Sequence, residues 1–264
     1  MLLAFDIGNS RIKAGVFSNN NFVEFYSFEN FESFHKIFLN QNFDQIAISS
    51  VVPKLTEKLI IKLKDYSEVT PFVIDRNVIL NLKIEYNSIE TLGVDRICSA
   101  EGAFHLYKKS HEFGNYNSTT FILSIDFGTA TTINIISFPG IFIGGAIAPG
   151  IQMMFDTLNS KTAQLPNVSE LNYKSIIGKD TFSSIASGVI NSTIGFIERT
   201  INHLKSEMNG SEFKIFITGG NAEKFAPHLN FEFSLVKELV LIGIKSIYDK
   251  NKPWRLDFNE TIID

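Results

Sequence analysis

The sequence lacks the features that mark secreted and membrane-spanning proteins. Its 264 residues include one cysteine, Cys98, so no disulfide can form within the chain, which fits a reducing compartment. No apolar run approaches the roughly 20 residues that span a bilayer, and the first residues lack the basic and apolar regions of a signal peptide. These absences predict a cytoplasmic protein that does not enter a membrane.

The sequence also has little concentrated positive charge. The formal net charge is -4, and no run is rich in Lys and Arg. A nucleic-acid partner is therefore not expected, since such a partner requires a basic face. A histidine-based metal site is not expected either, because the five histidines show no ligand spacing: His35, His105, His111, His203 and His228.

Apolar residues, by contrast, are plentiful. They make up 44% of the chain, and 25 of them are Phe, whereas charged residues make up 20%. This balance is typical of a globular protein with an aromatic-rich core. The length suffices for one large domain or for two lobes that each bury a core.

The N-terminal stretch MLLAFDIGNSRIKAGVF allows two interpretations. An apolar run ends on Asp6, turns over Gly8, Asn9 and Ser10, and is followed by a second apolar run. The simpler interpretation is a β-hairpin with ordinary turn residues. The other is a turn that binds a negatively charged ligand.

The hydrophobic pattern predicts alternating strands and helices along the chain. Strands are expected near 2–7, 11–17, 21–28, 45–51, 70–75, 121–127, 130–137, 141–149, 213–218 and 231–236. Helices are expected near 31–40, 53–66, 93–109, 150–158, 180–208 and 238–250, with a short one after Gly220. The polar segment HEFGNYNSTT is the best candidate for a break between lobes.

The hairpin pattern occurs twice, about 120 residues apart. LLAFDIGNSRIKAGVF aligns with FILSIDFGTATTINIIS, so that Asp6 matches Asp126, Gly8 matches Gly128 and Asn9 matches Thr129. Each copy is followed by a third strand and then by helices. The repeat predicts two similar α/β lobes facing each other across a cleft, an N-terminal lobe of residues 1–117 and a C-terminal lobe of residues 118–264.

Two such turns favour a phosphate ligand. A glycine turn lets backbone N–H groups approach an anion closely. An aspartate repels phosphate unless a cation such as Mg²⁺ lies between them. Lys13 can add positive charge near the first turn. Either aspartate alone is more simply a turn cap; the matched pair favours two loops that clasp a polyphosphate.

A third glycine element ends the predicted strand FKIFITGG. Gly219 and Gly220 would let a flat ligand lie against the backbone near a helix start. The alternative is a strand-to-helix connection that needs positive φ. Beside the two hairpins, a nucleoside site is the favoured interpretation.

Seven motifs, in order along nearly the whole chain, resemble those of the type III pantothenate kinases, which belong to the actin/hexokinase superfamily of two-lobed ATPases. They are DIGNS (6–10), GVDR (93–96), DFGTATT (126–132), GGAIAPG (144–150), TAQLP (162–166), GKDTFSSIASG (178–188) and TGG (218–220).

The resemblance implies an actin/hexokinase-like fold of duplicated mixed sheets with flanking helices around a nucleotide cleft. It implies ATP-dependent phosphorylation of pantothenate to 4'-phosphopantothenate, the first step of coenzyme A biosynthesis. It further implies Mg²⁺, a monovalent cation (K⁺ or NH₄⁺), and a homodimer with the pantothenate site near the interface.

The resemblance also implies roles for individual residues. Asp95 matches the general base and Asp126 the ligand of the monovalent cation. Tyr86 and Thr181 match pantothenate contacts, although Ile89 stands where the family often has proline. The substrate segment is Gly93, Val94, Asp95 and Arg96. The ATP contacts are Asp6, Ile7, Gly8, Asn9, Ser10, Arg11, Ile12, Lys13, Thr129, Gly219 and Gly220.

The GVDR chemistry can also be argued from its residues. Gly93 is a plausible helix start, which places Asp95 in the first turn, where the helix dipole favours negative charge. Asp95 can orient the attacking hydroxyl, and Arg96 can bind a substrate carboxylate through two hydrogen bonds. The alternative is a helix-start carboxylate beside a surface arginine.

Other interpretations remain open at this stage. The alternative function is an accessory factor that keeps the fold and regulates without catalysis. A sugar or acetate kinase fits less well because of GVDR, TAQLP and the short chain, and an actin-like filament protein fits less well because no inserted assembly subdomain is visible. Cys98 is expected in the core rather than as a nucleophile. Asp180 or Thr181 can cap the long helix, which is compatible with substrate contact by Thr181.

Overall fold

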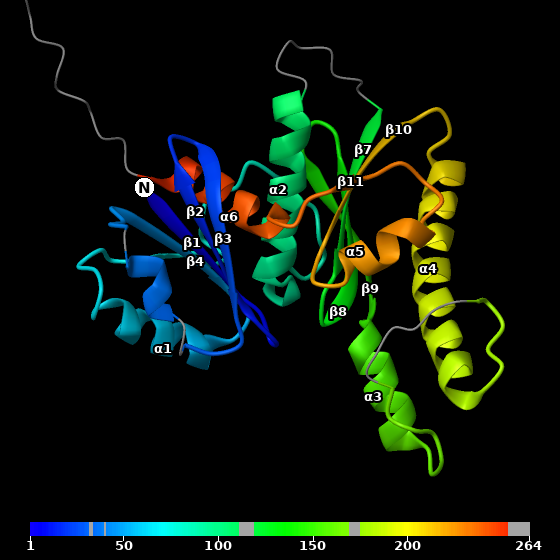
Figure 1. Cartoon of the computed structure of the whole chain (residues 1–264). Helices are drawn as coiled ribbons and strands as arrows, with labels where there is room; N and C mark the ends of the chain where they lie inside the picture. Colours follow the sequence, from blue (N-terminus) through cyan, green and yellow to red (C-terminus); the bar gives the residue numbers. More distant parts are fainter. Residues whose placement is uncertain (32–33, 40, 111–118, 169–174, 253–264) are drawn as a thin grey trace, which may run out of the picture.

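Two mixed β-sheets lie on either side of a central pair of helices in the computed structural model (Figure 1). The structure describes residues 1–31, 34–39, 41–110, 119–168 and 175–252. The first sheet has the strand order β3-β2-β1-β4-β5, and the second has the order β11-β10-β7-β8-β9-β6. The central helices are α2 (Val94–Ser110) and α6 (Leu239–Asn251).

The first sheet is built around β1, whose six residues are all buried. β1 pairs antiparallel with β2 and parallel with β4. β3 continues the antiparallel side, and β5 the parallel side. The strands are β1 (Leu2–Ile7), β2 (Ile12–Ser18), β3 (Asn21–Phe28), β4 (Gln45–Ser50) and β5 (Phe72–Val73).

The second sheet repeats this arrangement around β7. β7 pairs antiparallel with β8 and parallel with β10, while β9 and β11 extend the two sides. The repeat predicted from sequence is therefore confirmed at the level of strand order and direction. The strands are β7 (Thr120–Phe127), β8 (Ala130–Ser137), β9 (Ile141–Pro149), β10 (Glu212–Thr218) and β11 (Ser234–Leu235).

Each half of the chain supplies one element to the other half. β6 (Lys83–Ile84) pairs with β9 at the edge of the second sheet, and α6 packs on β1 and β4 of the first. The boundary predicted between residues 117 and 118 lies outside the described residues and stays a prediction. The exchange means that the two lobes are linked by more than one crossing of the chain.

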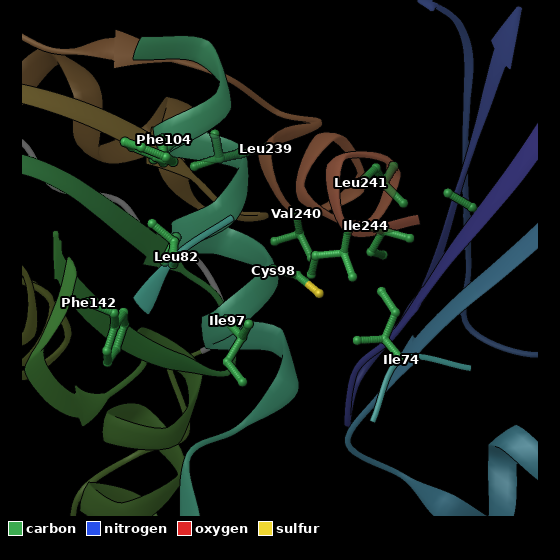
Figure 2. Packing of buried hydrophobic residues seen from close by; sticks show 14 of the residues in the cluster. Ile74, Leu82, Ile97, Cys98, Phe104, Phe142, Leu239, Val240, Leu241 and Ile244 are labelled. Atoms are coloured by element: carbon green, nitrogen blue, oxygen red, sulfur yellow. The ribbon is translucent and has the colours of Figure 1, made fainter. Parts of the chain in front are cut away.

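The central helices cross with their backbones in close contact. A Cβ on Gly102 would lie 2.1 Å from the Leu239 carbonyl oxygen, and one on Gly243 would lie 1.8 Å from that of Cys98. No side chain fits at either position, so the glycines are required for the crossing. Figure 2 shows Cys98 pointing from α2 into the apolar layer beside Val240 and Ile244, which confirms its predicted core position.

Among the remaining helices, α1 and α4 lie on the outer sides of the two sheets, while α3 continues from the end of β9 beyond the strands (Figure 1). Pro53 begins α1, where its missing N–H costs nothing. Asp180 and Ser183 form a capping box at the start of α4. The helices are α1 (Pro53–Leu63), α3 (Ile151–Lys161), α4 (Thr181–Glu207) and α5 (Ala222–Phe225), and none of the described helices is long and apolar enough to cross a membrane.

One helix prediction was wrong. The segment near residues 31–40 forms only a short 3₁₀ helix, η1 (Phe34–Phe38). Phe34 is fully buried and packs against the rings of Phe5, Phe38 and Tyr66. The spacing of the phenylalanines reflects this aromatic cluster rather than one face of a longer helix. Two further short 3₁₀ helices are η2 (Ile89–Thr91) and η3 (Ala226–His228).

Candidate functional site

The two repeated hairpin turns meet. The hydroxyl oxygens of Ser10 and Thr129 lie 2.8 Å apart, and they join the turn after β1 to the turn after β7. Gly150, the last residue of GGAIAPG, packs on the second turn and donates its N–H to the Thr129 carbonyl at 3.1 Å. The structure therefore brings DIGNS, DFGTATT and GGAIAPG to one place.

Asp6 lies at the end of β1, 8% exposed, opposite Lys13 in the β1–β2 register. The Lys13 Nζ is 3.8 Å from Asp6 Oδ2. Burial raises the pKa of Asp6 to about 6; the charge of Lys13 opposes the shift, and the charges of Asp126 and Asp95 add to it. The protein thus holds this carboxyl where its negative charge is unfavourable without a ligand.

Asp126 occupies the equivalent position at the end of β7. Its Oδ1 is buried and has no hydrogen-bond partner among the described residues. Burial raises its pKa, Lys13 opposes the shift and Asp95 adds to it. Gly219, at φ +101°, lies over this carboxylate, and a Cβ there would be 2.4 Å from Asp126 Oδ1. TGG is therefore the fourth motif at the site, and the buried oxygen is available to a cation.

The raised pKa of Asp6 predicts a pH-dependent cost to the fold. Between pH 4 and 6 the folded protein keeps a proton that the unfolded chain, with a pKa of 3.8, has released, so the free energy of unfolding falls as the pH rises through this window. The cost then persists above pH 6 and amounts to as much as about 3 kcal/mol.

Asp6→Asn cannot ionise and should therefore be more stable than the native protein at pH 7.5, with the difference vanishing near pH 4. Urea unfolding of both proteins at several pH values, without nucleotide or Mg²⁺, measures this difference. A stability difference that does not change with pH would contradict the role assigned to the Asp6 charge.

The GVDR motif begins α2, as predicted. The N–H groups of Arg96 and Ile97 both bond to the Gly93 carbonyl, and Asp95 Oδ1 accepts the Arg96 N–H at 2.8 Å. A Cβ on Gly93 would lie 2.4 Å from Asp95 Oδ1, so the glycine leaves room for the folded-back carboxylate. Because its charge raises the pKa of both Asp6 and Asp126, Asp95 belongs to the same cluster.

Arg96 is buried, 6% exposed, so the interpretation of a surface arginine is wrong. Its Nε donates to Asn134 Oδ1 at 2.7 Å, while its Nη2 is buried and unpartnered among the described residues. The guanidinium carbon lies 5.9 Å from the centre of the Tyr86 ring and 5.7 Å from that of Phe142. Tyr86 and Arg96 therefore lie together, as a shared substrate site requires.

Some predicted site residues are placed differently. The side chains of Ile7 and Ile12 are buried in the core, so only their backbone can face a ligand. Arg11 is exposed and pairs with Glu29 at 3.2 Å. Thr181 is the first residue of α4 and lines a separate hollow of about 990 Å³ between α3 and α4. None of the Asp6, Asp95 or Asp126 positions lines that hollow.

Two neighbours of Arg96 were missed from the sequence, Asn134 and Phe142. Asn134 is fully buried on β8, in a run that is otherwise mostly apolar beyond Thr132. A lone amide in a buried strand is the signal that could have pointed to it, because a buried amide needs partners. Nothing in the sequence distinguishes Phe142 from the other phenylalanines, so its place beside Arg96 could not be predicted.

Protein ligands alone do not make a closed metal site here. No group of three or more His, Cys, Asp or Glu residues is placed to hold a metal ion within the described ranges. The unpartnered Asp126 Oδ1 and the buried Asp6 carboxylate nevertheless offer the oxygen ligands that Mg²⁺ and K⁺ prefer, and Mg²⁺ commonly takes its other ligands from phosphate and water. The residues therefore fit a cation held together with a nucleotide.

Comparison with known proteins agrees with this geometry. The family model described as type III pantothenate kinase matches residues 2–203. The type III pantothenate kinase of Legionella pneumophila (strain Paris) is 34% identical over 259 residues, covering 93% of this chain and 97% of that protein. The one from Citrifermentans bemidjiense is 30% identical over 266 residues, covering 96% of this chain and 100% of the relative.

A solved structure shares the fold. The putative Baf family transcriptional activator from Campylobacter jejuni aligns with a TM-score of 0.58 at 21% identity, covering 94% of this chain and 98% of that chain. The fold prediction of two similar lobes, each a mixed sheet with flanking helices, is confirmed. On the family match and the two relatives, the chain belongs to the type III pantothenate kinase family.

Proposed function

We propose that this chain transfers the terminal phosphoryl group of ATP to the 4'-hydroxyl of pantothenate, the first step of coenzyme A biosynthesis. The observation that carries the proposal is the Ser10–Thr129 contact, which joins the turns that follow Asp6 and Asp126, the two carboxyl groups whose pKa the charge of Asp95 raises. A phosphoryl donor held by the turns would then lie next to Asp95. The expected location is the cytoplasm.

The nucleotide is assigned to the paired turns. The N–H groups of Asn9 and Ser10 make no hydrogen bond within the described part of the chain, whereas that of Gly8 closes the turn by bonding to the Arg11 carbonyl. The free amides and the hydroxyls of Ser10 and Thr129 suit phosphate oxygens. Gly220, beside which there is open space, leaves room for the nucleoside. Lys13 supplies positive charge.

The cations are assigned to the two strand-end carboxylates, Asp6 for Mg²⁺ and Asp126 for the monovalent cation. A bound cation would neutralise charge on the phosphates and allow carboxylate and phosphate to lie close together. The unpartnered Asp126 Oδ1 and the raised pKa of both carboxyl groups support the assignment.

The acceptor is assigned to the start of α2. Asp95 uses Oδ1 to bind the Arg96 N–H, which fixes the carboxylate and leaves Oδ2 to accept the proton of the attacking hydroxyl. Arg96 brings a guanidinium that forms no ion pair among the described residues and can attract the pantothenate carboxylate, and Tyr86 flanks it. The chain thus separates the proton acceptor from the group that holds the other end of the substrate.

Thr181 is assigned to substrate contact within a homodimer. Its hollow is largely apolar and is lined by Pro149, Met154 and Leu158 among others, and Ile147, Met153 and Phe182 are exposed nearby on the elements that form it. A second copy of the chain covering this face would bury these side chains and complete a site that one chain leaves open. Sedimentation velocity at micromolar concentration tests the dimer, and a monomer would remove this part of the proposal.

The function is tested by assaying ADP release with and without pantothenate, and by identifying the product by mass spectrometry. One 4'-phosphopantothenate per ADP is expected. An accessory factor that keeps the fold without catalysis predicts binding of ATP but no pantothenate-dependent turnover. That outcome would overturn the proposal.

A monovalent cation should control the rate. With Asp126 as its ligand, turnover should be high in K⁺ or NH₄⁺ and low in Na⁺ alone. Asp126→Ala should remove this dependence rather than scale all rates equally, since it deletes the ligand. Initial rates in chloride salts of the three cations, at constant ionic strength, measure the effect. Equal native rates in all three salts would count against the site.

A further inference from the structure

Arg96 carries a buried positive charge. The residue is 6% exposed, its Nη2 has no partner, and no ion pair joins it to an Asp or Glu among the residues that the structure describes. A buried charge without a partner is unfavourable unless a ligand of opposite charge binds. The guanidinium is therefore prepared for an anion.

A buried amide fixes the orientation of this guanidinium. Arg96 Nε donates to Asn134 Oδ1 at 2.7 Å, and Asn134 Nδ2 donates to the Ser124 hydroxyl at 3.1 Å. Ser99 also donates to Ser124, at 3.0 Å. The amide oxygen must face Arg96, because a guanidinium only donates hydrogen bonds. These hydrogen bonds fix the orientation of the Asn134 amide, with its oxygen towards Arg96 and its NH₂ group towards Ser124.

The second sheet leaves room for the Arg96 side chain. Ser124, Asn134 and Gly145 form one row across β7, β8 and β9 in the strand register. A Cβ on Gly145 would lie 3.0 Å from Arg96 Nη2 and 1.8 Å from the Ile133 carbonyl oxygen. The absence of a side chain at Gly145 leaves the space in which the free end of Arg96 lies.

The amide of Asn134 differs from a carboxylate in its effect on the charge of Arg96. An aspartate at position 134 would accept the same hydrogen bond from Nε, but its charge would pair with the guanidinium. The amide holds the geometry and leaves the positive charge unneutralised. A substrate carboxylate then meets an oriented cation whose full charge is available.

We propose that Asn134 is a positioning residue that sets the preference of the site for an acceptor bearing a carboxylate. Its amide oxygen fixes Arg96 through Nε, and the charge of the guanidinium stays available to the substrate carboxylate. The inference rests on the proposed function, because it takes pantothenate as the acceptor bound at Arg96.

The test compares pantothenate with the analogue in which its carboxylate is a primary amide. The native protein should favour pantothenate in kcat/KM. Asn134→Asp should lower that preference by about 10- to 100-fold, mainly through KM, because an ion pair now competes with the substrate. This variant should fold, since its carboxylate can accept from both Arg96 Nε and the Ser124 hydroxyl. Asn134→Leu, which removes the acceptor, should also lower the preference.

Two controls separate positioning from general destabilisation. Thr193→Val removes a buried hydroxyl that donates within α4, to the Val189 carbonyl at 3.0 Å, and should change stability without changing the preference. In an Arg96→Gln background, Asn134→Asp should have no further effect on the preference. A preference in Asn134→Asp equal to the native one would overturn the inference.

Equilibrium binding distinguishes failure of the inference from failure of the proposed function. Calorimetric titration with pantothenate and with its amide needs no turnover. If the native protein binds pantothenate more tightly than the amide but transfers no phosphoryl group, the proposed function fails. The inference then stands only if Asn134→Asp lowers the binding preference. If the native protein binds neither compound, both are overturned.

Discussion

Asp95→Asn should lower kcat by about 10²- to 10⁴-fold, the usual contribution of a general base. The asparagine oxygen can still accept the Arg96 N–H that Asp95 Oδ1 accepts at 2.8 Å. Its NH₂ group then replaces Oδ2, so a donor stands where the substrate hydroxyl needs an acceptor. ATP affinity should change little, because the phosphates are assigned to the hairpin turns.

The same substitution tests the simpler view that Asp95 only caps α2. Loss of a cap would lower stability by roughly 1 kcal/mol with near-normal turnover of the folded protein. Melting temperature, ATP binding and kcat measured on one preparation distinguish the two. Asp75→Asn is a matched control, since Asp75 also accepts a nearby backbone N–H, that of Asn77 at 2.8 Å. Turnover above about a third of the native rate in Asp95→Asn would mean that Asp95 is not the base.

Asp6→Asn should remove most turnover, by about 100-fold or more, in a protein that is more stable than the native one at pH 7.5. Burial makes the ionised form of Asp6 unfavourable, which is why its pKa is raised. A cation bound with ATP would stabilise the ionised form by pairing with its charge. Asparagine removes both the unfavourable charge and the ligand. Opposite changes in stability and activity are typical of a residue kept for function rather than for folding.

Glu29→Gln provides the control for Asp6→Asn. Glu29 is an exposed carboxylate just after β3, paired with Arg11 on the surface, and its loss should leave turnover near the native rate. Initial rates across a Mg²⁺ titration measure both variants. If Asp6→Asn turned over at the native rate at ordinary Mg²⁺, the assignment of Asp6 to the metal would fail.

The parts that the sequence predicted are those encoded locally. Asp6 and Asp126 each lie at the end of a strand, just before a glycine turn, so the short-range pattern suffices to place them. The match between the two patterns predicted the two lobes. GVDR was predicted as a helix start, and the structure begins α2 at Val94. These elements also belong to motifs whose order is specific to one family.

The parts that could not be predicted depend on contacts between distant residues. β6 is only two residues long and exists because β9, far along the chain, provides an edge. Arg96 was expected either to face a substrate or to lie on the surface, and its burial depends on Asn134 and Phe142 from the other half. The aromatic spacing near Phe34 resembled a helix because buried rings and helical turns recur at similar intervals.

The glycine crossing of α2 and α6 has a consequence for the internal symmetry of the chain. Gly102 lies against the carbonyl of Leu239, one helical turn before Gly243, and Gly243 lies against the carbonyl of Cys98, one helical turn before Gly102. Such reciprocal contacts are those of an isologous pairing, in which each partner uses the same feature. The two helices thus occupy matching places in the repeat, as the strand order of the two sheets does. The functional asymmetry then comes from one copy, since GVDR begins α2 whereas α6 begins with Leu-Val-Leu-Ile-Gly.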